Sequence, residues 1–533
     1  MSMRMNRVLA SVASLMLVLS PISVYAEDTV YASDESGNNY TSIDSAWNAA
    51  MSGTVIHMTS NWDLTSYLEV SEGVTATIMM DGYQIRRSDL SADMHQDSYL
   101  KGQVIYMDDS SNLTLDGSGA PKTSFTFSVS DKISNENQTV KSGGLITGGR
   151  SSADGCGINM SQSSTLTLKN VAIAGNISES TVGGSDGGAG INMNEDNVTV
   201  NLVNSIVAYN YSPGHGGGIL IKGDNAKLSL DNSSISNNVS NSGAGVYSDN
   251  EGTVIELKNK SHIDSNTANS IGGGVYIEDT NFKITSTDDT VNTISNNTCS
   301  SYGGGIYVEA EYVGSNSGEI SNLTFEGNTA DDSLYSTVYD GNGGAINIDQ
   351  ENIKVSNCII KSNYASDHGG GIYNSNDNNT IENCTIQNNK AGTAGGGVYQ
   401  YQKEDITLSG KVIITDNKRT DETNDDLMLE KTWAYTAYVK GEVTEGSKVG
   451  IRTGDDEETQ IGKDITSDCT NYLFLNDSGS YHISYEDGKV YKREGLTGSV
   501  FGNGNTIIAG CVMVGIVVIG VVVLVVNKKK TAK

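Results

Sequence analysis

Paired acids are among the side chains of this sequence best suited to chemistry. Carboxylates stand side by side at Asp288/Asp289 and at Asp331/Asp332, and such pairs can act as general acids and bases or as calcium ligands. Adjacent residues of a strand point to opposite faces, so only a bent loop could aim both acids of a pair at one substrate. We interpret the pairs as solvated loop charge, with catalysis or calcium binding as the alternative.

Two histidines are the next candidates, because His215 and His368 each directly precede a run of glycines. They occupy the same place in a repeated pattern, which favours a shared role in a turn over catalysis. Cysteines and histidines do not show the spacing of a metal centre. The sequence therefore predicts no catalytic residue, no metal site and no cofactor, with calcium as the one candidate ion.

Five tyrosines recur at one position of the same pattern, directly after a glycine-flanked Ile or Val. On a strand this position points away from the neighbouring aliphatic residue, so we expect an outward, partly interrupted aromatic stripe. Exposed rings can stack on sugars or on a protein partner, but tyrosine is also a good strand residue that stacks on itself. Binding and strand packing both stay open for Tyr247, Tyr276, Tyr307, Tyr373 and Tyr399.

The pattern that carries these residues is a sequence repeat. A glycine-rich triplet followed by an aliphatic residue recurs at Ile191, Ile219, Val246, Val275, Ile306, Ile346, Ile372 and Val398. A second signal, an apolar residue followed three positions later by asparagine, usually precedes each aliphatic by eight or nine residues. We expect these asparagines to form a structural ladder at an inside corner, each bonding to its counterpart in the next copy: Asn176, Asn210, Asn238, Asn266, Asn297, Asn328, Asn363, Asn389 and Asn417.

Between the two signals the apolar residues alternate with polar ones, as at Leu228 and Leu230. This period of two over three to five residues indicates short strands, and no helical periodicity runs through the repeats. Single strands of this length cannot build a core, whereas stacked copies bury a continuous one. The sequence therefore predicts an all-β solenoid, a parallel β-helix with coils stacked ~4.8 Å apart.

Two cysteines fit the same repeat. Cys358 and Cys384 precede equivalent apolar-x-x-Asn signals and lie one coil apart. Stacked neighbours ~4.8 Å apart are within the Cα range of a disulfide, while a pair of small buried hydrophobic residues is the alternative.

The repeat resembles a known family. Phe325-Glu326-Gly327-Asn328 followed by Gly343-Gly344-Ala345-Ile346 is similar to the FxxN and GGA[ILV] pair of polymorphic outer-membrane protein repeats. More broadly, the chain resembles right-handed parallel β-helix proteins of the pectin-lyase-like superfamily, strongly over about 150–420 and more weakly over about 40–150. The resemblance implies a right-handed solenoid, and it makes a polysaccharide lyase or glycoside hydrolase the enzyme hypothesis.

Such a lyase would use calcium-binding acids with an arginine or lysine base. The main repeat, about 158–400, contains no arginine. Four of its lysines have ordinary interpretations as solvated turn or strand residues: Lys222, Lys258, Lys283 and Lys361. The sequence therefore favours a protein without enzymatic activity, and leaves the enzyme as an alternative.

Net charge excludes another class of function. The 533 residues carry a formal charge of −30 at pH 7. A nucleic-acid binder needs a basic face that displaces phosphate counterions, so we expect no nucleic-acid partner.

The two ends of the chain carry targeting signals. Residues 1–26 have the two arginines, apolar stretch and small terminal residue of a secretory signal peptide. Residues 507–526 are 20 uncharged residues, long enough for one transmembrane helix, and the basic tail 527–533 would stay in the cytoplasm. Without these ends, 28 basic and 64 acidic residues leave the ectodomain at −36.

Three parts are expected between the ends. Residues 27–150 would form an N-terminal cap and early coils, including a short helix around Ser42–Ala50 whose Trp47 could plug the exposed core. The main repeats would fill 151–420, and 421–500 would be final coils or a small β cap.

The sequence as a whole predicts a single-pass protein of the cell membrane, with an extracellular rod and a Gram-positive type of surface. We expect a non-enzymatic adhesive protein that binds a glycan or a surface protein. A tethered carbohydrate-cleaving enzyme is the first alternative, and a passive surface-structure component is the second.

Overall fold

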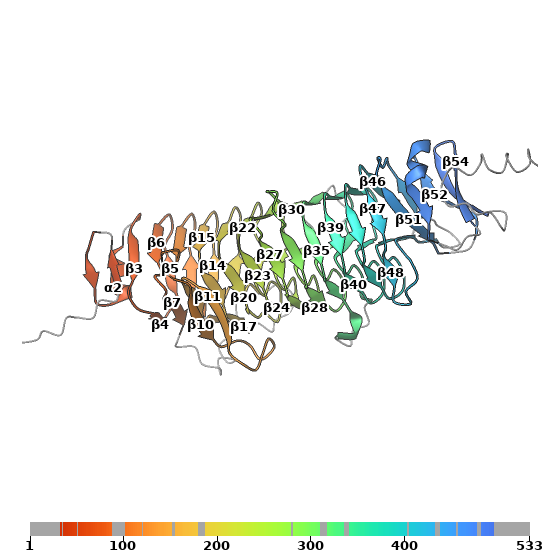
Figure 1. The fold of residues 1–533 in the computed structure, drawn as a ribbon. Coiled ribbons are helices and arrows are strands. Elements are labelled where there is room, and N and C mark those ends of the chain that lie inside the picture. The colour runs from red at the N-terminus through yellow and green to blue at the C-terminus, as the bar shows by residue number, and fades with distance from the viewer. Residues whose placement is uncertain are drawn as a thin grey trace, which may run out of the picture.

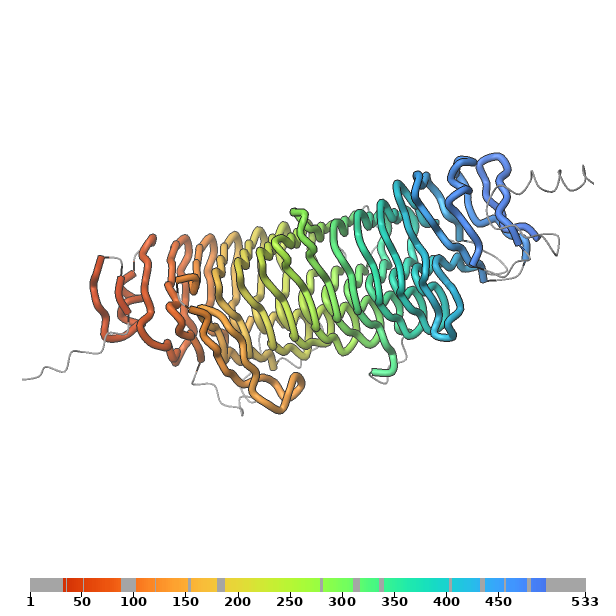
Figure 2. Tube along the Cα trace, in the orientation of Figure 1, coloured from red at the N-terminus to blue at the C-terminus, as the bar shows by residue number. Residues whose placement is uncertain are grey.

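The chain winds into an elongated solenoid, with the first described strands at one end and the last described strands at the other (Figures 1 and 2). The computed structural model describes residues 32–494 except 35, 51, 88–101, 120, 152–154, 180–186, 279–280, 310–316, 335–339, 402–404, 432–436, 455–456 and 477–480. The predicted signal peptide and transmembrane helix lie outside the described residues. Within the described part of the chain, no helix is long and apolar enough to cross a membrane.

Each coil contributes up to four short strands, and equivalent strands of successive coils pair in parallel and in register. For example, Ile219 faces Val246, and Leu228 faces Ile255. The all-β, parallel β-helical fold predicted from the sequence is therefore confirmed.

Four stacks run along the rod. The first stack follows the glycine triplets: β5 (Leu68–Val70), β8 (Ile105–Met107), β14 (Ile158–Met160), β18 (Ile191–Met193), β21 (Ile219–Ile221), β25 (Val246–Ser248), β29 (Val275–Glu278), β33 (Ile306–Glu309), β37 (Ile346–Asp349), β41 (Ile372–Asn374), β45 (Val398–Gln400) and β49 (Leu427–Leu429). The second stack follows the next turn: β3 (Val55–Met58), β6 (Thr75–Met79), β9 (Asn112–Asp116), β15 (Thr165–Lys169), β19 (Thr199–Val203), β22 (Lys227–Asp231), β26 (Thr253–Lys258), β30 (Phe282–Ser286), β34 (Gly318–Ser321), β38 (Ile353–Ser356), β42 (Asn379–Glu382), β46 (Asp405–Ser409), β50 (Tyr438–Lys440) and β52 (Thr459–Lys463).

The third stack precedes the ladder asparagines: β4 (Trp62–Leu64), β7 (Gln84–Arg87), β12 (Leu145–Thr147), β16 (Ala172–Ala174), β20 (Ile206–Ala208), β23 (Ser234–Ser236), β27 (His262–Asp264), β31 (Thr293–Ser295), β35 (Thr324–Glu326), β39 (Ile359–Lys361), β43 (Thr385–Gln387), β47 (Ile413–Thr415), β51 (Lys448–Thr453) and β53 (Leu473–Leu475). The fourth stack is shorter: β13 (Arg150–Ser151), β17 (Ile177–Ser178), β24 (Val239–Ser242), β28 (Thr267–Ile271), β32 (Thr298–Cys299), β36 (Thr329–Ala330), β40 (Tyr364–Ala365), β44 (Lys390–Ala391) and β48 (Lys418–Arg419).

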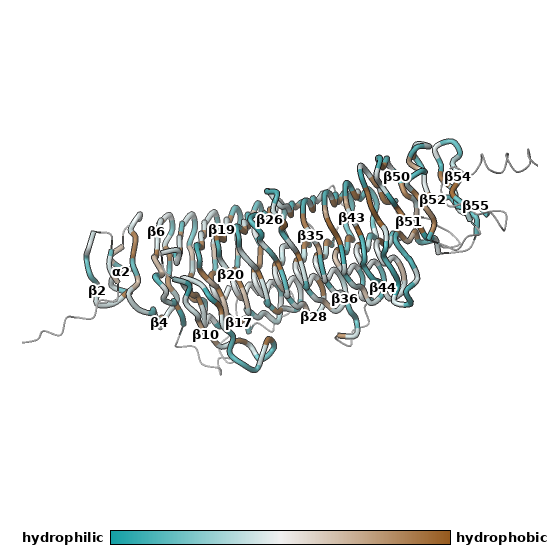
Figure 3. The backbone as a smooth tube through the Cα atoms, viewed as in Figure 1, coloured by the Kyte–Doolittle hydropathy of each residue, from teal (hydrophilic) through white to brown (hydrophobic). Residues whose placement is uncertain are grey.

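Aliphatic side chains fill the inside of the solenoid as columns. Along the third stack, Ile263, Ile294 and Phe325 succeed one another in register, and all three are fully buried. Figure 3 shows hydrophobic segments recurring coil after coil between hydrophilic turns. The core is thus continuous along the rod, as the period-2 alternation predicts.

The N-terminal end is closed by the short helix α2 (Ile43–Ala49) beside the antiparallel strands β1 (Ala32–Asp34) and β2 (Asn39–Tyr40). The Ser42 hydroxyl caps the helix by accepting the Ser45 N–H at 3.0 Å. Trp47 packs against the core, and its indole Nε1–H donates to the Glu69 carbonyl at 3.1 Å.

The C-terminal end combines the two arrangements that the sequence left open. Strands β49 to β53 continue the stacks, and β51 pairs with both β47 and β49. The short 3-10 helix η3 (Ser467–Tyr472) follows, and β54 (Tyr481–Glu486) and β55 (Lys489–Glu494) then form an antiparallel pair on β52. This pair covers an edge that would otherwise offer unpaired backbone groups.

Two insertions interrupt the regular coils. The hairpin of β10 (Thr123–Phe127) and β11 (Gln138–Ser142) forms its own two-stranded sheet on the side of the rod (Figure 1). A short 3-10 helix, η2 (Asp332–Leu334), follows β36.

Candidate functional site

A buried asparagine ladder runs along one inside corner of the solenoid. The Asn266 side-chain Oδ1 accepts both the backbone N–H and the Nδ2–H of Asn238, each at 3.0 Å, and the Asn266 Nδ2–H donates to the Ile235 carbonyl at 3.0 Å. The same links recur from Asn176 to Asn417, and all nine side chains are buried. These asparagines stabilise the bend between the third and fourth stacks. Their side chains are buried from solvent, so their role is structural.

Two residues that the sequence analysis missed extend the ladder. Asp426 Oδ1 accepts the Asn417 backbone N–H at 2.8 Å and its Nδ2–H at 3.1 Å. Asn476 Nδ2 then donates to Asp426 Oδ2 at 2.9 Å. Asp426 follows Asn417 by only nine residues, so coil spacing could not identify it.

The five repeated tyrosines lie on the first stack, but their expected exposure is wrong. Tyr247, Tyr276 and Tyr307 are each 3% exposed and Tyr399 is 5% exposed, while Tyr373 is half-buried. Ring centroids are 5.0 Å apart for Tyr247 and Tyr276, and 5.1 Å for Tyr276 and Tyr307. The rings therefore pack against one another, with Tyr247 edge-on to Tyr276 and Tyr276 stacked on Tyr307.

Residues just before the glycine triplets cover this tyrosine stripe. His215 stacks on Tyr247 with a centroid separation of 4.3 Å, and His368 lies 4.3 Å from Tyr399. Tyr302 packs on Tyr307 at 5.6 Å. Both histidines thus pack on a tyrosine ring, in agreement with the predicted shared role in a turn.

The glycines allow this close cover. Gly272 has φ +62°, a region that favours glycine, and a Cβ added there would lie 2.5 Å from the Tyr276 Cβ. The turn backbone consequently lies directly on the tyrosine ring.

A column of acidic side chains accepts hydrogen bonds from the tyrosine hydroxyls. Tyr247 donates to Glu278, which is one coil further along, and Tyr276 donates in the same way to Glu309. Tyr307 donates to Asp349 at 3.0 Å. The sequence signal that would have revealed these partners is an acid two residues after the repeated tyrosine position, which Asn347 occupies before Asp349.

Burial dominates the electrostatics of these pairs. Burial and the bond to Glu309 raise the pKa of Tyr276 far above its usual range, so the phenol stays protonated and acts as a donor. Burial also raises the pKa of the Asp349 carboxyl. The tyrosine column and the acid column are thus joined by hydrogen bonds that stabilise the first stack.

The two cysteines predicted as neighbours are buried free thiols in the structure. The Cys358 backbone N–H donates to Cys384 Sγ at 3.4 Å. In earlier coils the same link uses serine: the Ser205 N–H donates to Ser233 Oγ at 3.0 Å, and the Ser233 N–H donates to Ser261 Oγ at 3.1 Å. The Cys384 thiol thus takes the place of a hydroxyl in a second, serine-based ladder.

The acid pairs do different things. Asp288 shapes its own turn by accepting bonds from the Asn259 N–H at 2.6 Å and from the Thr290 hydroxyl at 2.8 Å. Asp331 accepts the Ser333 hydroxyl at 2.7 Å beside η2. These contacts agree with the interpretation of the acid pairs as charged residues of loops.

Asp288 and Asp289 also line an open groove of about 470 Å³, together with Glu256, Lys283 and Glu319. Lys283 forms an ion pair with Glu319 at 3.3 Å. The other acid pair, near residue 331, does not line this groove. Among the described residues, no group of three or more His, Cys, Asp or Glu side chains is placed to hold a metal ion.

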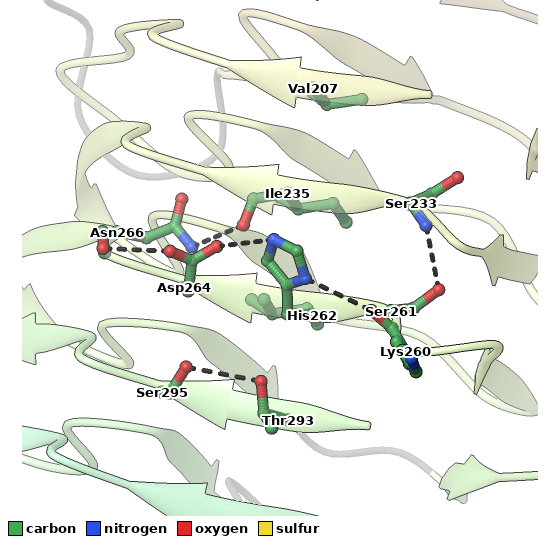
Figure 4. A network of polar contacts seen from close by, with 12 residues as sticks. Val207, Ser233, Ile235, Lys260, Ser261, His262, Asp264, Asn266, Thr293 and Ser295 are labelled. Carbon is green, nitrogen blue, oxygen red and sulfur yellow. Dashed lines mark hydrogen bonds and ion pairs between the residues drawn. The ribbon is translucent and has the colours of Figure 1, made fainter. Parts of the chain in front are cut away.

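A histidine that the sequence analysis did not consider lies on the third stack. His262 Nδ1 is 3.4 Å from the Lys260 carbonyl, and His262 Nε2 is 3.4 Å from Asp264 Oδ1 (Figure 4). Burial raises the pKa of Asp264, opposed by His262. Both nitrogens of the ring lie near a polar group, so His262 takes part in a polar network on the third stack.

Comparison with known proteins identifies the repeat. The family of the Chlamydia polymorphic membrane protein repeat matches residues 293–309 and 322–349. These segments hold β31 to β33 and β35 to β37, and the second contains the FxxN and GGA[ILV] signals. A comparison with curated proteins gave no significant match. Two segments of the solenoid thus match the polymorphic membrane protein repeat, in agreement with the resemblance.

Proposed function

We propose that the protein is a non-enzymatic adhesive rod of the cell surface, which binds a glycan or protein partner through a lateral face of its solenoid. The observation that carries the proposal is the polymorphic membrane protein repeat inside a continuous parallel β-helix. The family's description refers to a membrane protein, which supports a surface location. The predicted segments 1–26 and 507–526 support export and a single membrane anchor.

The shape and charge of the molecule agree with this role. A solenoid offers long lateral faces because each coil contacts only its neighbours. An ectodomain charge of −36 keeps such a rod soluble and repels other acidic surfaces. Partner contact is therefore expected at defined places on the rod and not through general attraction.

Display on cells tests the proposal. Cells carrying the full chain are compared with cells whose chain lacks residues 27–505, for antibody labelling without permeabilisation and for adherence to glycan-coated and protein-coated surfaces. We expect surface labelling and stronger adherence of the full chain. Labelling with equal adherence would overturn adhesion in favour of a passive spacer, and loss of labelling would overturn the surface location.

The groove beside β30 supports a second candidate, a tethered polysaccharide-cleaving enzyme. Glu256, Lys283 and Glu319 supply the acids and the base that such a reaction needs within one open groove. Shortening of a polysaccharide by the wild-type chain, lost in Glu256→Gln and Glu319→Gln variants, would favour this candidate over the adhesive rod.

A further inference from the structure

The β10–β11 hairpin is docked on the solenoid and does not project freely. Phe125, Phe127 and Val140 form a hydrophobic cluster with Leu145, Ala172 and Ala174 on the third stack. At the positions of Ala172 and Ala174, later coils carry polar pairs such as Ser234 and Ser236 or His262 and Asp264. The small apolar side chains therefore mark the place where the hairpin sits.

A cleft of about 500 Å³ opens between this hairpin and the fourth stack. Val129, Ser130 and Lys132 line it from the hairpin, and Arg150, Glu179 and Tyr211 line it from the solenoid. The cleft is large enough for a sugar residue and mixes apolar and polar walls, as small-molecule sites do.

Two cations, Lys132 and Arg150, line this cleft together with two acids, Asp131 and Glu179. The Arg150 Nε–H donates to the Glu179 carboxylate, whose side chain is only 9% exposed, and the pair fixes the guanidinium at the cleft wall. Lys132 is exposed, and within the described ranges it forms no ion pair. The ectodomain has 28 basic and 64 acidic residues, so a cleft whose two cations balance its two acids is less acidic than the rod as a whole.

We propose that this cleft binds the carboxylate of an acidic sugar residue on a glycan, which rests on the proposed adhesive function. The Arg150 guanidinium has the planar donors that match a carboxylate, and Lys132 adds a point charge. The Tyr211 and Val129 side chains offer apolar surface to a pyranose ring, and the Ser130 hydroxyl offers a polar contact.

The other acids restrict the ligand further. Asp131 and Glu179 also line the cleft, and the surrounding rod is strongly acidic. Salt screens the charges beyond about 8 Å at physiological ionic strength, so the acids of the surrounding rod are screened whereas Asp131 and Glu179 are not. A densely charged polyanion meets repulsion along its whole length, which favours a glycan with an isolated acidic residue.

Binding to a matched pair of glycans tests the proposal. The full chain is titrated with a neutral oligosaccharide that ends in one carboxylate-bearing sugar, and with the same oligosaccharide after reduction of that carboxylate to an alcohol. We expect the acidic form to bind about tenfold more tightly, a difference of about 1.4 kcal/mol, and the preference to shrink as salt is raised.

Variants locate the site. Lys132→Met and Arg150→Gln are each expected to remove most of the preference, whereas Lys122→Met, on the same hairpin but outside the cleft, keeps it. Lys132 is exposed, so its replacement leaves the fold intact even if loss of Arg150 exposes the buried Glu179. Equal binding of the two glycans, or full preference in Lys132→Met, would overturn the proposed cleft. The proposed adhesive function would still stand if cells displaying the wild-type chain adhere, and it would fall if those cells do not adhere.

Discussion

One ladder asparagine satisfies three polar groups at once. The Asn266 side chain accepts two N–H groups of Asn238 and donates to the Ile235 carbonyl, all in the buried interior. Asn266→Ala leaves these groups without partners, and an unsatisfied buried group costs about 1–3 kcal/mol. We expect the free energy of unfolding to fall by about 2–4 kcal/mol, measured by denaturant titration.

Asn241→Ala is the matched control for that variant, because Asn241 is exposed and lies outside the ladder. A change of less than about 0.5 kcal/mol is expected there. Equal losses in the two variants would contradict the structural role of the ladder.

Tyr276 tests whether the aromatic stripe binds a partner or only packs. Tyr276→Ala removes a buried ring from between Tyr247 and Tyr307, and such truncations cost about 3–5 kcal/mol. We expect a clearly lower melting temperature with unchanged adherence of displaying cells. Tyr276→Phe keeps the ring, loses only the bond to Glu309, and should fall between wild type and alanine. Lost adherence in a Tyr276→Phe variant that remains folded would restore a recognition role for the stripe.

Asp425 gives a prediction of pH dependence. Burial raises the pKa of Asp425 to about 6, opposed by the Gly395 N–H, Arg452 and Arg419. This folded-state pKa lies above the 3.8 of an ordinary aspartate, so the folded chain takes up the proton first. The ionised Asp425 consequently lowers the free energy of unfolding above pH 6, and this loss of stability shrinks as the pH falls toward 4.

Comparison of Asp425→Asn with wild type isolates this effect. The variant's melting temperature, relative to wild type, should be highest near pH 7.5 and should decline steadily down to about pH 4. A difference that does not change across this range would show that the carboxylate does not titrate as the burial implies.

At the scale of the element, the coil is the unit that can be exchanged. The successive strands β37, β41 and β45 pair in register. Removal of residues 372–397 joins Gly371 to Val398 and recreates a glycine triplet before an aliphatic residue. We expect this variant to stay folded, because each repeat contacts only its neighbours. Deletion of residues 385–397, half a coil, should abolish the fold. Circular dichroism and thermal unfolding of both variants check this, and loss of structure in the first would contradict coil equivalence.

The same equivalence explains how much the sequence could predict. The parallel β-helix, the repeated tyrosine position and the continuous core follow from regular spacing, because in-register stacking maps a period of the sequence onto a column in space. The short helix beside Trp47 follows from local capping at Ser42. Features of this kind need no knowledge of distant contacts.

Features that break the period could not be predicted. Asp426 extends the asparagine ladder from a loop of irregular length. The tyrosine rings are covered by His215, Tyr302 and His368, whose turn geometry depends on glycines with positive φ. The cleft depends on a hairpin that docks through its own small cluster. Each is a contact between elements, and a one-dimensional pattern does not encode its geometry.

At the scale of the whole molecule, both ends of the rod are closed. Helix α2 covers the first coils, and the β54–β55 pair covers an edge of the last ones (Figure 1). Closed ends protect against end-to-end pairing with other copies. The lateral faces, with the groove beside β30 and the cleft beside the hairpin, are then left for contact with a partner.

The central claim is that these faces bind without cleaving. The most direct measurement incubates residues 27–505 with a panel of acidic and neutral polysaccharides, with and without calcium, and follows polymer retention and polymer size together. We predict that the protein retains at least one polysaccharide and that the size of this polymer does not change. Shortened chains would contradict it and identify an enzyme, whose residues would be sought first at Glu256, Lys283 and Glu319.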